Sequence, residues 1–358
     1  MISGKGIISS LVLSILLLNS YSQNLGHIAE KIRVKYNIPE LGYSIVSADS
    51  VYELQVTGYK NIQTPAKADL QDRFRIGSNT KAITGFLAAI FVKQGKLSWD
   101  TKFFDLFPEL KTESDSAYYD MTLIQMVTMR TSLPGYSYTN EEPHQEQFIG
   151  NKREQRLQFF AWMLRQPPVI KPGLNMTNLG FVGAGLMLEK TSNMTYEDLV
   201  NNLGNELKIK FGFGNPNFED STQPWGHNAQ LTPEAPANNY KLNWLLSAGN
   251  INVSLPDYAK FIQMELSGIA GHSSLLSQEE FRLLLLGFQA FSAGWYVEEQ
   301  ADGSKIAYNI GNPGTFYSVV HVEPGIDKAF IIFANAQTPK SEKGVSVLLS
   351  KMKKKYRK

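Results

Sequence analysis

The stretch FRIGSNTKAITGFLAAIFVKQGK, residues 74–96, decides the fold of this chain. Its apolar residues recur at spacings of three and four positions, at Ile83, Phe86, Leu87, Ile90 and Phe91. This spacing predicts an amphipathic helix with one buried face, which ends near Gly95. Ser78 therefore lies at the start of a helix that belongs to the core.

Lys81 follows Ser78 by three residues, so the two side chains share one face of the predicted helix. The Lys81 amine can therefore approach the Ser78 hydroxyl, as a weak nucleophile requires of an activating base. The helix N-terminus adds a positive field that favours a neutral amine and a developing oxyanion. A serine before a helix is also a common N-cap, so the function of this pair depends on the rest of the chain.

The composition is that of an ordinary globular protein, with 43% hydrophobic and 11% aromatic residues. The formal charge is only +2, and no basic stripe is interleaved with aromatic residues, so we expect no nucleic-acid partner. The absence of cysteine excludes a disulfide framework, a thiol nucleophile and a lipobox-type anchor. We interpret the basic tail KMKKKYRK, residues 351–358, as a frayed, solvated helix end.

The N-terminus has the layout of a signal peptide. Lys5 precedes an apolar run from Ile7 to Leu18, and the small residues of Ser20-Tyr21-Ser22 precede Gln23. The apolar run is too short to span a bilayer. We therefore expect residues 1–22 to be removed and the protein to be exported, to the periplasm or outside the cell, with no integral membrane span. A retained N-terminal anchor is the alternative.

Strand patterns occur at both ends of the chain and helix patterns occur between them. Residues 42–46 and 51–59 form a predicted hairpin, and the last third contains predicted strands at residues 294–297, 305–309, 316–322 and 328–334. This order predicts an α+β fold with an antiparallel sheet built from N- and C-terminal strands and flanked by helices. We predict one domain, residues 23–358, with an α/β part at about 23–95 and 245–358 and a mostly helical insert at about 96–244.

Two polar segments are candidates for the surroundings of the site. Residues 136–153 contain three glutamates and no apolar period, which is typical of a surface loop, here a candidate lid. His227, in Pro224-Trp225-Gly226-His227, is either a residue of the cleft or a hydrogen-bonded structural histidine. The five histidines have no metal-ligand spacing, so we expect no metal and no cofactor.

Several segments together resemble one known superfamily. Residues 74–81, FRIGSNTK, resemble the nucleophile motif of the serine β-lactamases and penicillin-binding proteins. Further similar segments follow in the order of that superfamily: Gly95–Asp100, Thr131-Ser132-Leu133-Pro134, Ser247-Ala248-Gly249, Gly294-Trp295 and Phe333-Ala334-Asn335. The similarity is to the branch of class C β-lactamases, D-Ala-D-Ala carboxypeptidases and related esterases. It implies a β-lactamase-like fold with Ser78 as nucleophile and Lys81 as base.

Two motifs depart from the superfamily pattern. The second motif is usually Tyr-x-Asn, and the matching residues here are Met176-Thr177-Asn178; methionine cannot exchange a proton. The third motif is usually Lys-Thr-Gly or His-x-Gly, and the match is Asn309-Ile310-Gly311, which carries no charge. The resemblance implies that Asn178 positions the lysine and the substrate, that Asn309 and Gly311 lie beside the substrate, and that the backbone N–H groups of Ser78 and Asn312 form the oxyanion hole.

Three explanations of the missing tyrosine remain open. Lys81 alone acts as the base, with a pKa lowered by burial; Tyr136 or Tyr138 of the loop supplies the hydroxyl; or the register at Met176 is shifted.

We therefore predict an exported serine hydrolase that forms an acyl-enzyme on Ser78 with an ester, amide or β-lactam, from a small molecule or a peptide. The alternative is a weakly active or inactive protein of the same fold that binds cell-wall peptide or a protein partner, because Met176 and Asn309 replace reactive groups.

Overall fold

The structure is a computed structural model that describes residues 25–237 and 239–357. The predicted signal peptide, residues 1–22, lies outside the described residues. Within the described part of the chain, no helix combines the length and the apolar composition that a membrane span requires.

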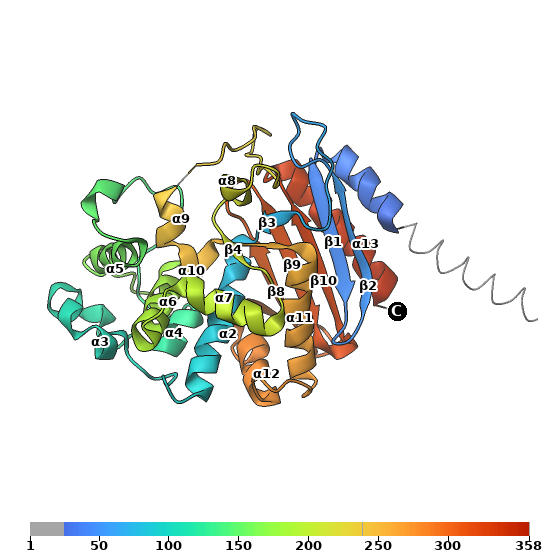
Figure 1. The fold of residues 1–358 in the computed structure, drawn as a ribbon. Helices are drawn as coiled ribbons and strands as arrows, with labels where there is room; N and C mark the ends of the chain where they lie inside the picture. Colours follow the sequence, from blue (N-terminus) through green and yellow to red (C-terminus); the bar gives the residue numbers. More distant parts are fainter. Residues whose placement is uncertain (1–24, 238, 358) are drawn as a thin grey trace, which may run out of the picture.

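A seven-stranded antiparallel sheet joins the two ends of the chain (Figure 1). Its β1 strand pairs with β10 near the C-terminus, with Leu41 opposite Ala334 and Val46 opposite Ala329. In sheet order the strands are β2 (Val51–Gly58), β1 (Glu40–Val46), β10 (Lys328–Ala334), β9 (Tyr317–Glu323), β8 (Lys305–Gly311), β7 (Trp295–Glu299) and β6 (Ala290–Ser292). The predicted α+β class, with a sheet from both ends of the chain, is confirmed.

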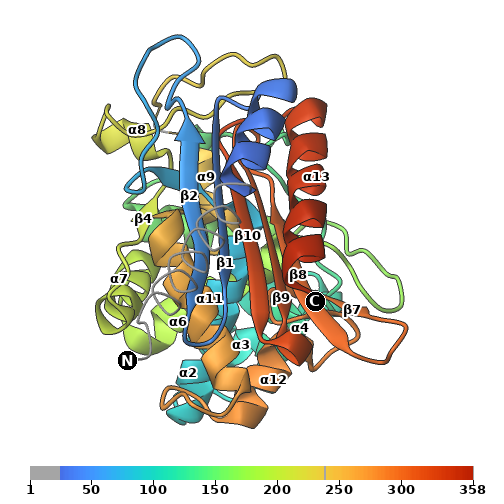
Figure 2. The same ribbon diagram turned by 90° about the vertical axis from the view of Figure 1, so that its right-hand side faces the viewer.

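Helices cover both faces of this sheet, because its central strands are apolar on both sides. In β10, Phe330 and Ile332 pack with the helix of residues 25–35 and with α13 (Pro339–Tyr356), and Ile331 and Phe333 belong to the larger core on the other face. Figure 2 shows the two terminal helices side by side on one face, with α11 (Leu255–Ile269) behind the sheet. The predicted helix of residues 74–96 is α2 (Thr80–Lys93), buried in that larger core.

The middle of the chain supplies most of the remaining helices, which lie beside the sheet in Figure 1. They are α3 (Phe103–Leu106), α4 (Leu123–Val127), α5 (Lys152–Met163), α6 (Leu179–Ser192), α7 (Tyr196–Leu207), α8 (Pro216–Glu219), α9 (Tyr240–Trp244) and α10 (Leu246–Gly249), followed later by α12 (Gln278–Leu286). A second, three-stranded sheet has the order β3 (Arg73–Arg75), β5 (Ile251–Ser254) and β4 (Gly212–Phe213). In this small sheet, β3 ends three residues before Ser78.

The prediction of a frayed, solvated C-terminal tail is wrong for the residues that the structure describes. Helix α13 continues to Tyr356, and the tail contacts carboxylates of the sheet. Arg357 and Lys353 both pair with Glu323 of β9, at 2.6 and 2.9 Å, and Lys355 pairs with Glu53 of β2 at 2.8 Å. These lysine and arginine side chains therefore link the last helix to the sheet, because the helix lies close enough for them to contact the glutamates of the strands.

Candidate active site

A tight turn between β3 and α2 carries Ser78. Gly77, Ser78 and Asn79 form one turn of 3₁₀ helix, and Gly77 has a φ of +51°, which a residue with a Cβ rarely adopts. A Cβ on Gly77 would also lie 2.7 Å from the backbone nitrogen of Asn312. The glycine therefore lets the serine turn approach the end of β8 closely.

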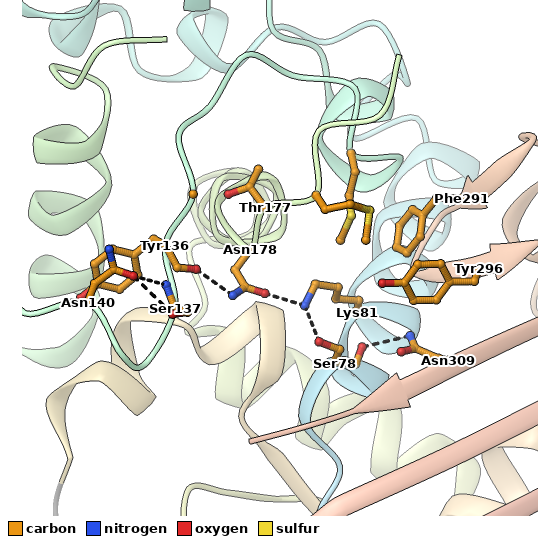
Figure 3. A pocket seen from close by; sticks show the side chains of 13 residues that line it. Ser78, Lys81, Tyr136, Ser137, Asn140, Thr177, Asn178, Phe291, Tyr296 and Asn309 are labelled. Carbon is orange, nitrogen blue, oxygen red and sulfur yellow. Dashed lines mark hydrogen bonds between the residues drawn. The ribbon is translucent and has the colours of Figure 1, made fainter. Parts of the chain in front are cut away.

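Lys81 lies in the first turn of α2 with its amine beside the Ser78 hydroxyl. Its Nζ is 2.9 Å from Ser78 Oγ and 2.8 Å from Asn178 Oδ1 (Figure 3). It is also 2.7 Å from the carbonyl oxygen of Ala248. Burial lowers the pKa of Lys81 to about 7, because removing the ammonium from water disfavours the charged form. A neutral amine can donate to Asn178 and Ala248 and still accept the Ser78 proton.

Asn178 lies at the N-cap of α6 and holds Lys81 from the far side of the cleft. Its amide nitrogen donates to the carbonyl oxygen of Tyr136 at 2.8 Å, which fixes the orientation of its oxygen toward the lysine. Met176, two residues earlier, lines the same cleft with 46% of its surface exposed. Asn178 thus contacts Lys81, and Met176 brings no hydroxyl to this part of the cleft.

The end of β8 lies against the serine turn. Asn309 is 1% exposed, and its side-chain nitrogen donates to the carbonyl oxygens of Ser78, at 3.1 Å, and of Gly294. Both amide hydrogens are used inside the protein, so none is left for a substrate carboxylate. A Cβ on Gly311 would lie 1.9 Å from the Ile76 oxygen, so this strand end requires glycine. Asn312 is exposed, and its backbone nitrogen lies next to Gly77.

The two loop tyrosines do not present free hydroxyls to the Ser78–Lys81 pair. The Tyr136 ring packs against Phe159 and Trp244, with ring centroids 4.7 and 6.5 Å apart. Its hydroxyl is buried and has no hydrogen-bond partner within the described part of the chain. The Tyr138 hydroxyl donates to the carbonyl oxygen of Gly249 at 3.1 Å. The loop therefore contributes backbone to the site, through the Tyr136 carbonyl that holds Asn178.

His227 is fully buried and lies outside the residues that line the cleft. Its Nδ1 is 2.8 Å from the carbonyl oxygen of Asn335, and its Nε2 is 3.1 Å from the backbone nitrogen of Ile62. This pairing requires a neutral ring that donates from Nδ1 and accepts at Nε2, and burial lowers the His227 pKa accordingly. His227 is therefore a hydrogen-bonded structural residue that links the segments of Ile62 and Asn335.

The cleft above Ser78 has a volume of about 430 Å³ and two chemically different walls. Apolar side chains form one wall, from Met129, Met176, Phe291 and Tyr296, and polar residues form the other, from Ser137, Asn140 and Thr177. Sequence reasoning missed Tyr296, although it directly follows the Gly294-Trp295 segment. Among residues 25–237 and 239–357, no group of three or more His, Cys, Asp or Glu side chains is arranged to hold a metal ion.

In this site a serine hydroxyl pairs with a buried lysine at the start of a helix, beside a strand of an antiparallel sheet. This arrangement is characteristic of the serine β-lactamase and penicillin-binding-protein superfamily. The sequence profile of the Beta-lactamase family matches residues 25–348. The chain therefore belongs to this family. Its residues 25–348 include every candidate residue of the cleft.

Solved structures with the same fold include three at a TM-score of 0.72–0.73. They are an octameric penicillin-binding protein homologue from Pyrococcus abyssi (TM-score 0.73, 18% identity, 92% of this chain and 77% of that one), a D-alanine carboxypeptidase AmpC from Burkholderia cenocepacia (0.72, 17%, 92% and 99%) and a class C beta lactamase from Rhodobacter sphaeroides (0.72, 17%, 92% and 98%). At these identities the likeness shows the fold alone.

Curated relatives are equally distant in sequence. Protein flp of Staphylococcus aureus (strain COL) is 20% identical over 328 residues, which cover 89% of this chain and 64% of that protein. The chain thus spans a little under two thirds of the length of this relative.

Proposed function

We propose that this protein is an exported serine hydrolase that forms an acyl-enzyme on Ser78. The observation that carries the proposal is the 2.9 Å contact between Lys81 Nζ and Ser78 Oγ, made by an amine whose pKa burial lowers to about 7. Near neutral pH a large fraction of this amine is unprotonated. It can therefore take the serine proton, which an ordinary lysine with a pKa of about 10.4 cannot do.

The reaction then follows from the groups around the pair. The Ser78 oxygen attacks the substrate carbonyl carbon while its proton passes to Lys81, and the carbonyl oxygen becomes an oxyanion. The backbone N–H groups of Ser78 and Asn312 are the proposed donors to that oxyanion, aided by the positive N-terminus of α2. Asn178 and the Ala248 carbonyl hold the resulting ammonium.

The proposed substrate class is a carboxylic ester, an amide or a β-lactam. Lys81 is the cationic side chain among the described residues that line the cleft, and it is already engaged with three acceptors. Asn309 has no free amide hydrogen. A substrate carboxylate would thus lack a charged partner, which favours neutral esters and amides over substrates that are recognised through a carboxylate.

Covalent labelling tests this function. Purified protein would be treated with a fluorescent fluorophosphonate or a fluorescent penicillin, and the adduct would be mapped by peptide mass. We expect an adduct on Ser78 that is absent in Ser78→Ala, with Ser137→Ala, a second serine of the cleft, as the matched control that still labels. No adduct together with no ester turnover would sink the proposal.

A binding protein of the same fold is the second candidate function. Met176 stands where the family has its proton-exchanging tyrosine, and Asn309 stands where it has a cation or histidine, so both reactive positions are inert. This candidate predicts an unlabelled Ser78 and saturable binding of a cell-wall peptide in the same cleft. Peptide binding measured by calorimetry, lost when Asn140 and Thr177 are replaced by alanine, would support it.

Export is proposed from the N-terminal sequence pattern. The mature protein recovered from an expressing cell should begin at Gln23 when its mass is measured. A mature protein that retains residues 1–22 would contradict export by signal-peptide cleavage.

A further inference from the structure

The proposed chemistry still lacks one group, which carries the proton from the Lys81 ammonium to the leaving atom. Lys81 can remove the Ser78 proton, but a family member would pass that proton onward through the tyrosine whose position Met176 occupies. The Tyr136 hydroxyl is buried, and the Tyr138 hydroxyl donates to the carbonyl oxygen of Gly249. Neither loop tyrosine is therefore placed to replace the missing hydroxyl.

Tyr296 reaches the cleft from the opposite side, at the start of β7. Figure 3 shows its hydroxyl end pointing into the cleft toward Lys81, across from Asn178. The ring is fixed on two sides: it stacks on Tyr308 with centroids 5.2 Å apart, and it meets the edge of Phe291 at 5.1 Å. The ring is held by aromatic contacts, and its hydroxyl makes no hydrogen bond with residues 25–237 or 239–357, so the polar end is available to a bound molecule.

We propose that Tyr296 is the proton relay of this site and replaces, from the sheet side, the hydroxyl that Met176 lacks. This inference rests on the proposed function at Ser78. In this proposal Tyr296 contacts the leaving atom of the substrate during catalysis. Tyr296 belongs to β7, whereas the second motif ends at Asn178, the N-cap of α6.

The proton balance of acylation is then closed. The Ser78 O–H bond breaks, its proton goes to Lys81, and a bond forms between Ser78 Oγ and the carbonyl carbon. When the tetrahedral intermediate collapses, the bond from carbon to the leaving oxygen breaks. That oxygen takes the Tyr296 proton, and Tyr296 recovers one from the Lys81 ammonium. The products are acyl-Ser78 and a neutral alcohol, with Lys81 and Tyr296 in their starting states.

The surroundings of Tyr296 keep it in the donor form. The titratable side chains of described residues that line the cleft are Lys81, Tyr136 and Tyr296, and Tyr308 faces Tyr296 from β8. Burial, and then the neighbouring Tyr308, raise the pKa of Tyr296. The phenol therefore remains protonated at neutral pH and can donate.

Leaving-group dependence tests the proposal, with Tyr296→Phe as the variant. Phenylalanine keeps the ring stacked on Tyr308 and removes only the hydroxyl. An alkoxide leaving group needs a proton as the bond breaks, whereas p-nitrophenolate leaves without one. We expect kcat/KM for an ethyl ester to fall about 10²-fold, in the range for loss of a general acid, and kcat/KM for the matching p-nitrophenyl ester to change by less than about threefold.

Two controls separate this inference from other effects. Tyr308→Phe removes a hydroxyl from the same aromatic stack outside the cleft lining and should leave both esters unchanged. Equal losses for both esters in Tyr296→Phe, or no loss for either, would overturn the relay. Fluorophosphonate labelling of Ser78 in the same variant should be retained, because fluoride leaves without a proton. If the wild-type protein itself does not label, the proposed function has failed; if it labels and the two esters respond alike, only the role of Tyr296 has failed.

Discussion

Replacing Glu265 by glutamine should make the protein more stable in mildly alkaline solution. Glu265 lies on the buried side of α11, has no exposed surface, and neither carboxyl oxygen has a hydrogen-bond partner among the described residues. Burial raises its pKa from 4.5 to about 8. The folded protein therefore holds Glu265 as a neutral acid at pH 7, whereas the unfolded chain ionises it.

The magnitude follows from this shift. A folded-state pKa above the unfolded value gives stability that is complete below pH 4.5 and is lost as the pH rises to about 8. At about 1.4 kcal/mol per pKa unit, the loss is about 5 kcal/mol, with no further contribution from Glu265 at higher pH. Glutamine has nearly the same shape and does not ionise, so its burial cost is independent of pH.

Urea unfolding at pH 5, 6, 7, 8 and 9 measures the effect. The free energy of unfolding of Glu265→Gln should match that of the wild type within about 1 kcal/mol at pH 5 and exceed it by about 4–5 kcal/mol at pH 8. Glu279→Gln, an exposed glutamate on α12, is the matched control and should show no such divergence. A constant difference between Glu265→Gln and wild type at every pH would refute the reasoning.

Two further predictions concern the serine turn. Because only the neutral Lys81 amine accepts a proton and burial lowers its pKa to about 7, kcat/KM for a neutral ester should rise from pH 5 and level off above about pH 7; a profile without an inflection between pH 6 and 8 would exclude Lys81 as the base. Gly77→Ala should destabilise the protein by about 1–3 kcal/mol and abolish labelling of Ser78, since its Cβ would meet Asn312. Gly303→Ala has a similar positive φ in open space, so it should lose stability and keep labelling.

Much of the fold could be predicted because its signals are local. The period of α2 and the apolar strands at both ends are readable along the chain, and the α+β class and the family are confirmed. The prediction of an exposed tail was wrong, because the sequence does not show which carboxylates its cations pair with. Their partners Glu53 and Glu323 lie on distant strands, which only the folded sheet brings to α13.

The site was predictable where one element carries both partners. Ser78 and Lys81 share α2 and its preceding turn, so their spacing sets their approach. The direction of a side chain across a cleft is not encoded in that way. Asn309 lines the cleft, but its amide hydrogens go to the carbonyl oxygens of Ser78 and Gly294, which the sequence does not show. Tyr296 enters the cleft from the start of β7, where strand alternation does not show which way the ring turns.

The pairing of β1 with β10 has a consequence for how the molecule comes into being. This pair joins residue 46 to residue 329, and the serine turn contacts the end of β8 through Gly77 and Asn309. Contacts so distant along the chain form late, after the entropy of closing a long loop has been overcome. A nascent chain that has passed residue 81 thus carries the Ser78–Lys81 pair without the strand that supports the serine turn. The contacts of this turn with β8 form only after the C-terminal strands have been synthesised.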